Sequence, residues 1–259
     1  MSKNRPQPHD FALLIAAHGE RRAGAGNAGV AEIAADLIRR NLAEEIGIGF
    51  IKGIPRIDET LRAFASATVL VYPLFLSDGY FNRVRLPQLI AKGAGWRRVR
   101  VLPPLGLDPA LAALVAGRAV VALAAAGHAA TGSTLVLFAH GSPSDPASRA
   151  ATEAMAARLA GERRFANERE FANERQFADV RCAFLDEPPG LADTIAGVRG
   201  PLAVVGLFAG EGLHGGADLP RLLSGLARPD LVFAGNVGGF DGIADIVAGA
   251  VAREAAEPA

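Results

Sequence analysis

The sequence has little cysteine, no net charge and no long uninterrupted apolar run, and each of these absences excludes a class of protein. Its one cysteine, Cys182, can form neither an internal disulfide nor a cysteine zinc site, which favours a cytosolic protein. The 27 basic residues balance 27 acidic ones, so no overall field attracts nucleic acid or an anionic membrane. The longest apolar stretch, residues 111–126, is interrupted by Gly117 and Arg118 and falls short of a membrane span. The sequence therefore predicts a soluble, cytoplasmic protein that binds neither nucleic acid nor membrane.

The sequence does contain an internal repeat and enough apolar residues for a buried core. Half of its 259 residues are hydrophobic. The segment Phe11–Glu20 matches the later segment Ser133–Ser142, and both are apolar runs that lead into Ala-His-Gly. The segment Val71–Phe81 matches Val204–His214 in the same way. Two matches in the same order predict that the chain is an internal duplication.

The duplication predicts two domains, residues 1–128 and 129–259. The second pair of matched segments is spaced more widely than the first pair, so the second half must contain an insertion. Residues 165–176 read Phe-Ala-Asn-Glu-Arg-Glu followed by Phe-Ala-Asn-Glu-Arg-Gln, a tandem repeat whose length accounts for the wider spacing within one residue. We interpret the repeat as an extension of a solvated helix or loop, with a partner-binding strip as the alternative.

Each half alternates apolar strands with amphipathic segments. Residues 30–38 and 151–159 have the spacing of helices with one buried face. Continuous apolar strands between such helices indicate parallel sheets covered on both faces. We therefore predict two similar three-layer α/β domains. The expected strands are residues 11–17, 46–51, 68–75 and 98–102 in the first half, and 134–139, 180–185, 202–208 and 230–234 in the second.

Histidines stand where the predicted strands end. Ligands of parallel α/β sheets bind at the carboxyl ends of the strands. His18 and His140 directly follow the first strand of each half, and Phe81 and His214 follow the third. Phenylalanine can neither bind a metal nor move a proton, so only the second half has a complete pair.

A carboxylate follows the same trend. After its second strand the C-terminal half reads Phe-Leu-Asp-Glu-Pro, residues 184–188, whereas the N-terminal half reads Phe-Ile-Lys-Gly-Ile-Pro, residues 50–55. Two imidazoles and a carboxylate are a ligand set for first-row transition metals, and a neutral imidazole also accepts protons. We therefore expect the second half to bind a metal, and we interpret His18 as a structural residue.

Three motifs in this order resemble the class II tetrapyrrole chelatases, in particular the sirohydrochlorin cobalt or iron chelatases. They are the strand ending in His-Gly-Ser (residues 140–142), the acidic segment 184–188, and the Leu-Phe-x-x-Gly-x-His loop that leads to Leu-Pro (residues 207–220). The resemblance covers nearly the whole chain. It identifies a fused form of two chelatase-like halves whose N-terminal half departs from the pattern at Lys52 and Phe81.

The resemblance implies that the protein is an enzyme that inserts a divalent metal into sirohydrochlorin, in cobalamin or sirohaem biosynthesis. Cobalt(II) is the expected metal, with iron(II) or nickel(II) as alternatives. The metal is a substrate, so no permanently bound cofactor is expected, and we expect a monomer or weak homodimer. The implied roles are metal binding by His140 and His214, proton handling by Glu187 and substrate binding by Ser142, Arg149 and Gly212, with Arg181, Arg83 and Arg85 as further candidate cations.

Other functions are compatible with parts of the pattern. A histidine phosphatase would have arginine before its catalytic histidine, but Ala17 and Ala139 stand there. The string Gly24-x-Gly26-x-x-Gly29 fits a dinucleotide fingerprint but begins about six residues after the strand rather than immediately. A non-catalytic carrier of a tetrapyrrole or a metal ion remains as the alternative function.

The tandem repeat gives a first prediction. Deleting residues 165–176 should preserve the fold and keep activity within a few-fold, because changing the length of a surface loop costs little entropy. Circular dichroism, soluble yield and turnover of the shortened protein measure this. An insoluble or unfolded product would show that the repeat packs into the core.

Overall fold

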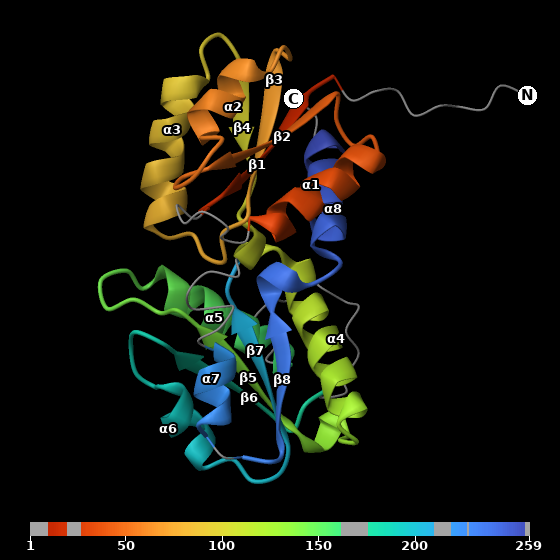
Figure 1. The fold of residues 1–259 in the computed structure, drawn as a ribbon, viewed down its shortest axis with the longest axis vertical. Coiled ribbons are helices and arrows are strands. Elements are labelled where there is room, and N and C mark those ends of the chain that lie inside the picture. Colours follow the sequence, from red (N-terminus) through yellow and green to blue (C-terminus); the bar gives the residue numbers. More distant parts are fainter. Residues whose placement is uncertain (1–9, 20–26, 162–175, 210–218, 227, 257–259) are drawn as a thin grey trace, which may run out of the picture. The chain divides into compact units, whose positions relative to one another are not determined.

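The structure is a computed structural model that describes residues 10–19, 27–161, 176–209, 219–226 and 228–256. Two four-stranded sheets lie between layers of helices (Figure 1). All paired strands run parallel, in the order β2-β1-β3-β4 in one sheet and β6-β5-β7-β8 in the other. The predicted fold class, two similar parallel-sheet α/β domains, is confirmed.

The elements of the second half repeat those of the first. The strands are β1 (Ala12–Ala17), β2 (Glu45–Phe50), β3 (Thr68–Pro73), β4 (Arg98–Val101), β5 (Thr134–Ala139), β6 (Asp179–Phe184), β7 (Leu202–Leu207) and β8 (Leu231–Asn236). The α-helices are α1 (Ala28–Arg39), α2 (Ile57–Ala63), α3 (Leu86–Gly93), α4 (Pro109–Ala125), α5 (Ala147–Leu159), α6 (Leu191–Ala196), α7 (Leu219–Ser224) and α8 (Ile243–Ala256).

The sequence forms these layers because each element buries the face that its pattern predicts. Strands β1 and β5 are buried along their whole length, as expected for continuous apolar runs in the centre of a parallel sheet. Helix α1 buries Val30, Ala34 and Leu37, which share one face of a helix. Within the described ranges, no helix combines the length and apolarity needed to cross a membrane.

The pairing register of the two sheets confirms the duplication. Leu14 lies beside Val71 in the first sheet, and Val136 lies beside Val204 in the second. The two sequence matches align Leu14 with Val136 and Val71 with Val204, so matched residues occupy matched places in the two sheets. A side-chain hydrogen bond is repeated as well, because Thr60 donates to the Ile48 carbonyl at 2.7 Å and Thr194 donates to that of Cys182 at 3.3 Å.

The same register locates the insertion. Ala12 at the start of β1 pairs with Glu45, and Thr134 at the start of β5 pairs with Asp179. The chain from Thr134 to Asp179 is longer than the chain from Ala12 to Glu45 by the length of the tandem repeat at 165–176. The insertion therefore lies in the connection between β5 and β6. Residues 165–175 of the repeat lie outside the described residues.

The compact units of the structure do not coincide with the two sequence halves. The first unit comprises Met1–Phe75, Tyr80–Leu105 and Asp241–Ala259, and the second comprises Leu76–Gly79 and Gly106–Phe240. Helix α8 packs against α1, whereas α4 packs against β7 and β8. The division predicted between residues 128 and 129 therefore separates the repeats, but each repeat ends in a helix that belongs to the other repeat's unit.

A buried carboxylate joins the two helices on one face of the first sheet. Asp58 of α2 is 1% exposed and forms ion pairs with Arg56 at 3.1 Å, Arg62 at 3.0 Å and Lys92 of α3 at 3.4 Å. Burial acts to raise the pKa of this carboxyl, but the hydrogen bonds from Arg62 and Arg56 and the charge of Lys92 outweigh it, so the pKa lies below its ordinary value. Asp58 therefore remains ionised and links α2 to α3.

This cluster predicts that Asp58→Asn lowers the free energy of unfolding by about 2 kcal/mol at pH 7, since hydrogen bonds to a charged group are lost. A carboxyl with a lowered folded pKa stabilises the fold above its unfolded pKa, and this contribution disappears as the pH falls through the folded pKa. The difference from wild type should therefore shrink in acid. Chemical denaturation at several pH values measures it.

Asp36→Asn is the matched control, because Asp36 of α1 is only partly buried and pairs with two exposed arginines, Arg39 at 2.8 Å and Arg40. An exposed pair of this kind contributes at most about 1 kcal/mol. Equal losses in the two variants at pH 7 would contradict the assignment of Asp58 as the stabilising link.

Candidate metal-binding site

Both sheets have the same strand order, and the site predicted from the sequence lies at the carboxyl end of the second sheet. From β5 the chain moves to β6 at one edge of the sheet, whereas from β7 it moves to β8 at the other edge. The loops that follow β5 and β7 therefore diverge at a topological switch point, where open α/β sheets bind their ligands. His140 follows β5 directly. His214 and Gly212, the predicted residues of the loop after β7, lie outside the described residues.

Main-chain hydrogen bonds hold the loop after β5 against the loop after β6. The Leu185 amide donates to the Ala139 carbonyl at 3.0 Å, and the Asp186 amide donates to the His140 carbonyl at 2.9 Å. Gly141 follows with a φ of 71°, and a Cβ there would lie 2.8 Å from the Glu187 side chain. The close approach of the two loops therefore requires glycine at this position.

This approach places Asp186 beside His140. The imidazole Nδ1 lies 3.3 Å from Asp186 Oδ2 and 3.2 Å from the Gly141 carbonyl oxygen. Both side chains are about half exposed, at 47% and 51%. Two oxygen acceptors at Nδ1 favour the tautomer with its proton there, which leaves the Nε2 lone pair available to a metal. Among the described residues, no group of three or more metal-binding side chains occurs.

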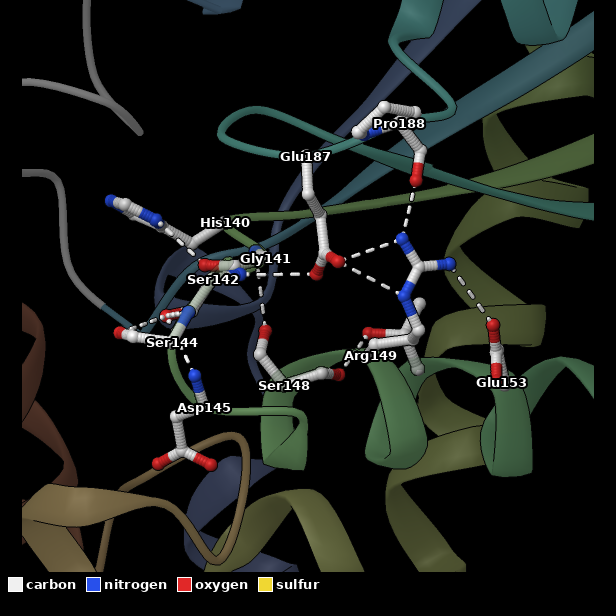
Figure 2. Close-up of polar contacts among 11 residues, drawn as sticks. His140, Gly141, Ser142, Ser144, Asp145, Ser148, Arg149, Glu153, Glu187 and Pro188 are labelled. Atoms are coloured by element: carbon white, nitrogen blue, oxygen red, sulfur yellow. Dashed lines mark hydrogen bonds and ion pairs between the residues drawn. The ribbon is translucent and has the colours of Figure 1, made fainter.

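Glu187, the predicted proton-handling residue, points the other way. Its Oε1 accepts a hydrogen bond from the Ser142 amide at 3.0 Å, and its Oε2 accepts two from Arg149, at 3.0 and 2.7 Å (Figure 2). The side chain is only 13% exposed. The hydrogen bonds from Arg149 and then from Ser142 hold the pKa of Glu187 below its ordinary value. Glu187 is therefore a weak base whose contacts fasten the two loops together.

The predicted substrate-binding residues Arg149 and Ser142 take part in the same network. Arg149 also contacts the Pro188 carbonyl, donates to Glu153 at 3.2 Å and lies 4.4 Å above the Phe184 ring (Figure 2). Ser142 Oγ accepts hydrogen bonds from the amides of Ser144 and Asp145 at 3.3 and 3.2 Å. Both side chains therefore shape the loop, and substrate binding by them stays a prediction.

The other candidate cations lie elsewhere. Arg181 lies within β6 and contacts Asp179 at 2.7 Å and the Thr194 carbonyl at 3.0 Å, so it faces α6 rather than the carboxyl end of the sheet. Arg83 and Arg85 belong to the short π-helix Phe81–Arg85 that follows β3 in the first unit. Arg85 donates to Gln88 at 2.6 Å.

His140 and Glu187 were both predicted as site residues, but the acid that lies beside His140 is Asp186. The two acids are adjacent, and the pattern alone does not show which one faces the histidine. The missing signal was Arg149, a cation far away in the sequence that forms hydrogen bonds with Glu187, whereas Asp186 stays half exposed beside His140. An arginine that closes a loop cannot be distinguished from one that binds substrate by sequence alone.

Comparison with known proteins agrees with this architecture. The protein-family model for CbiX matches residues 12–122. A solved CbiX structure, the terminal enzyme for siroheme biosynthesis in denitrifying bacteria, is 28% identical, covers 95% of this chain and 100% of its own, and has a TM-score of 0.73. Residues 12–122 therefore resemble the CbiX family in sequence, and the chain shares its fold with the solved CbiX structure.

Other solved structures share the fold. The chain is 26% identical to a multi-domain protein from Deinococcus radiodurans with structural similarity to chelatases, with a TM-score of 0.77 over 93% of this chain and 55% of that one. SirB from Bacillus subtilis with Fe³⁺ shares the fold at 17% identity, with a TM-score of 0.77 over 95% and 96% of the two chains. No curated protein matched the chain.

The different contacts of the two neighbouring acids give a prediction. Asp186→Asn should weaken cobalt(II) binding about tenfold or more, because an acid beside a metal-binding imidazole orients the ring and raises its basicity. Glu187→Gln should leave cobalt affinity nearly unchanged but lower Tm at pH 7. Titration calorimetry with cobalt chloride and thermal unfolding measure both effects.

The pH dependence separates the two roles further. Because the pKa of Glu187 is lowered in the fold, its stabilising contribution is present above the ordinary carboxyl pKa and is lost as the pH falls through the lowered value. The Tm difference between Glu187→Gln and wild type should therefore vanish in acid. Loss of cobalt binding in Glu187→Gln with none in Asp186→Asn would reverse the assignment.

Proposed function

We propose that the protein inserts a divalent metal ion, cobalt(II) or iron(II), into sirohydrochlorin. The observation that carries the proposal is the half-exposed His140 and Asp186 pair at the switch point of the second sheet, in a chain that shares its fold with a CbiX structure. A solved relative is the terminal enzyme for siroheme biosynthesis, which supports a tetrapyrrole substrate. A SirB structure with the same fold holds cobalt.

In this mechanism His140 presents the metal ion through Nε2, and His214 supplies a second nitrogen. A metal ion that must be released should have only a small number of protein ligands, because the tetrapyrrole nitrogens can then displace them. Insertion expels two pyrrole protons, so a base must stand close to the metal. Asp186 is the exposed carboxylate beside His140 and takes this role in place of Glu187, whose oxygens are engaged by Arg149 and Ser142.

The donor set also determines what the protein can select. Imidazole and carboxylate without thiolate favour borderline divalent ions, and affinity for these follows the general first-row order. The protein therefore accepts both cobalt(II) and iron(II), and we expect cobalt turnover at least comparable with that of iron. Imidazole must be unprotonated to coordinate, so the rate should fall in acid.

The test follows the absorbance of sirohydrochlorin with cobalt(II) or iron(II) under anaerobic conditions. His140→Ala should lower the rate at least about a hundredfold, because a direct ligand matters more than the groups that support it, and His214→Ala should do the same. His18→Ala, the equivalent change in the first unit, should keep most of the rate at saturating tetrapyrrole.

Three outcomes would overturn the proposal or its parts. Stoichiometric binding without turnover by wild type would favour a carrier of tetrapyrrole or metal. Equal loss in His18→Ala and His140→Ala would show that the metal site is not confined to the second unit. Activity with iron alone would remove cobalt as a substrate.

A further inference from the structure

The first unit repeats the backbone of the candidate site but changes the charge of its side chains. The Ile51 amide donates to the Ala17 carbonyl at 3.0 Å, and the Lys52 amide donates to that of His18 at 2.7 Å. These bonds correspond one for one to those of Leu185 and Asp186 in the second unit. Lys52 therefore occupies the position of Asp186, and a cation replaces the acid beside the histidine.

The surroundings of Lys52 are aromatic. The rings of His18 and Phe81 meet edge to face with their centroids 4.6 Å apart, and the Lys52 ammonium lies 5.7 Å from the centroid of the Phe81 ring. Tyr80 packs against Phe81 at 5.7 Å. Within the part of the chain that the structure describes, Lys52 forms no ion pair with a carboxylate, so its charge is not neutralised there.

Apolar side chains are exposed at the same carboxyl end of the sheet. Ile54, which follows Lys52 closely in the chain, is 86% exposed, and Tyr80 is 52% exposed. The short π-helix Phe81–Arg85 adds the cations Arg83 and Arg85. Exposed apolar and aromatic groups next to cations suit a ligand with a flat apolar body and an anionic margin.

These features exclude one function and favour another. The Lys52 ammonium lies over the Phe81 ring that His18 contacts, and its charge repels a divalent cation that approaches this histidine. The same ammonium group attracts a carboxylate, and the aromatic rings offer a surface to a macrocycle. We propose that His18, Lys52, Ile54, Tyr80 and Phe81 form an anionic-macrocycle site that holds a carboxylate and the apolar face of the tetrapyrrole.

This inference rests on the proposed function, because it assigns a binding site for the same substrate. It predicts that the first unit contributes tetrapyrrole affinity and the second contributes metal affinity. The first contribution is measured by titrating the protein with metal-free sirohydrochlorin and recording the quenching of the tetrapyrrole fluorescence. The second contribution is measured by calorimetric titration with cobalt(II) in the absence of tetrapyrrole.

Lys52→Met should raise the Kd for metal-free sirohydrochlorin about fivefold, the effect of losing one exposed charge contact. Lys52→Glu should raise it further, because repulsion replaces attraction. Both variants should bind cobalt as wild type does, which also shows that they are folded. The affinity of wild type should fall with added salt more steeply than that of Lys52→Met.

Arg39→Met is the matched control. Arg39 ends α1, which returns from the carboxyl end of β1 to the start of β2, so its charge lies at the opposite end of the sheet. This variant makes the same change in net charge and should leave sirohydrochlorin affinity unchanged. Equal weakening in Arg39→Met and Lys52→Met would mean that only net charge matters and would overturn the site.

The two proposals fail in different ways. If wild type inserts metal while Lys52→Met and Lys52→Glu bind sirohydrochlorin as tightly as wild type, the macrocycle site is wrong and the function stands. If wild type binds sirohydrochlorin in a Lys52-dependent manner without inserting metal, the site stands and the chelatase function is wrong. Absence of sirohydrochlorin binding by wild type would overturn both.

Discussion

The hydrogen bond from the Asp186 amide to the His140 carbonyl, at 2.9 Å, brings together two loops that are far apart in the sequence. It fixes the distance between a histidine and an acid, and it forces the chain past Gly141 in a conformation with positive φ. The ion pair of Glu187 with Arg149 then keeps the same loops together through side chains. The candidate site at the carboxyl end of the second sheet depends on this main-chain hydrogen bond, because without it no carboxylate would lie beside the imidazole.

The first unit shows that this main-chain hydrogen bond does not depend on which side chains the two loops carry. The Lys52 amide bonds to the His18 carbonyl at 2.7 Å, and Gly19 has a φ of 70°. A duplicated frame can therefore keep its geometry while the side chains at its ends diverge. An acid in one unit and an ammonium group in the other are differences of single residues, and they separate attraction for cations from attraction for anions.

Much of the fold could be predicted from the sequence, because the apolar strands and the repeat are local patterns. Which of Asp186 and Glu187 lies beside His140 could not be predicted, since this depends on Arg149, a partner of Glu187 in another element. The assignment of α4 and α8 to the compact units was also beyond the sequence. Both helices bury apolar residues, and neither pattern states which sheet those residues cover.

The place of α8 has a consequence for biosynthesis of the chain. The first unit contains β1 near the start of the chain and α8 at its end, where Asp245 pairs with Arg40 at 2.5 Å and Glu254 pairs with Arg100. Domains generally fold as units while the ribosome is still extending the chain. Here β1 to β4 are synthesised long before α8, the helix that packs against α1, because nearly the whole second unit lies between them in the chain. All segments of the second unit are synthesised before α8, so the second unit can complete its fold before the first.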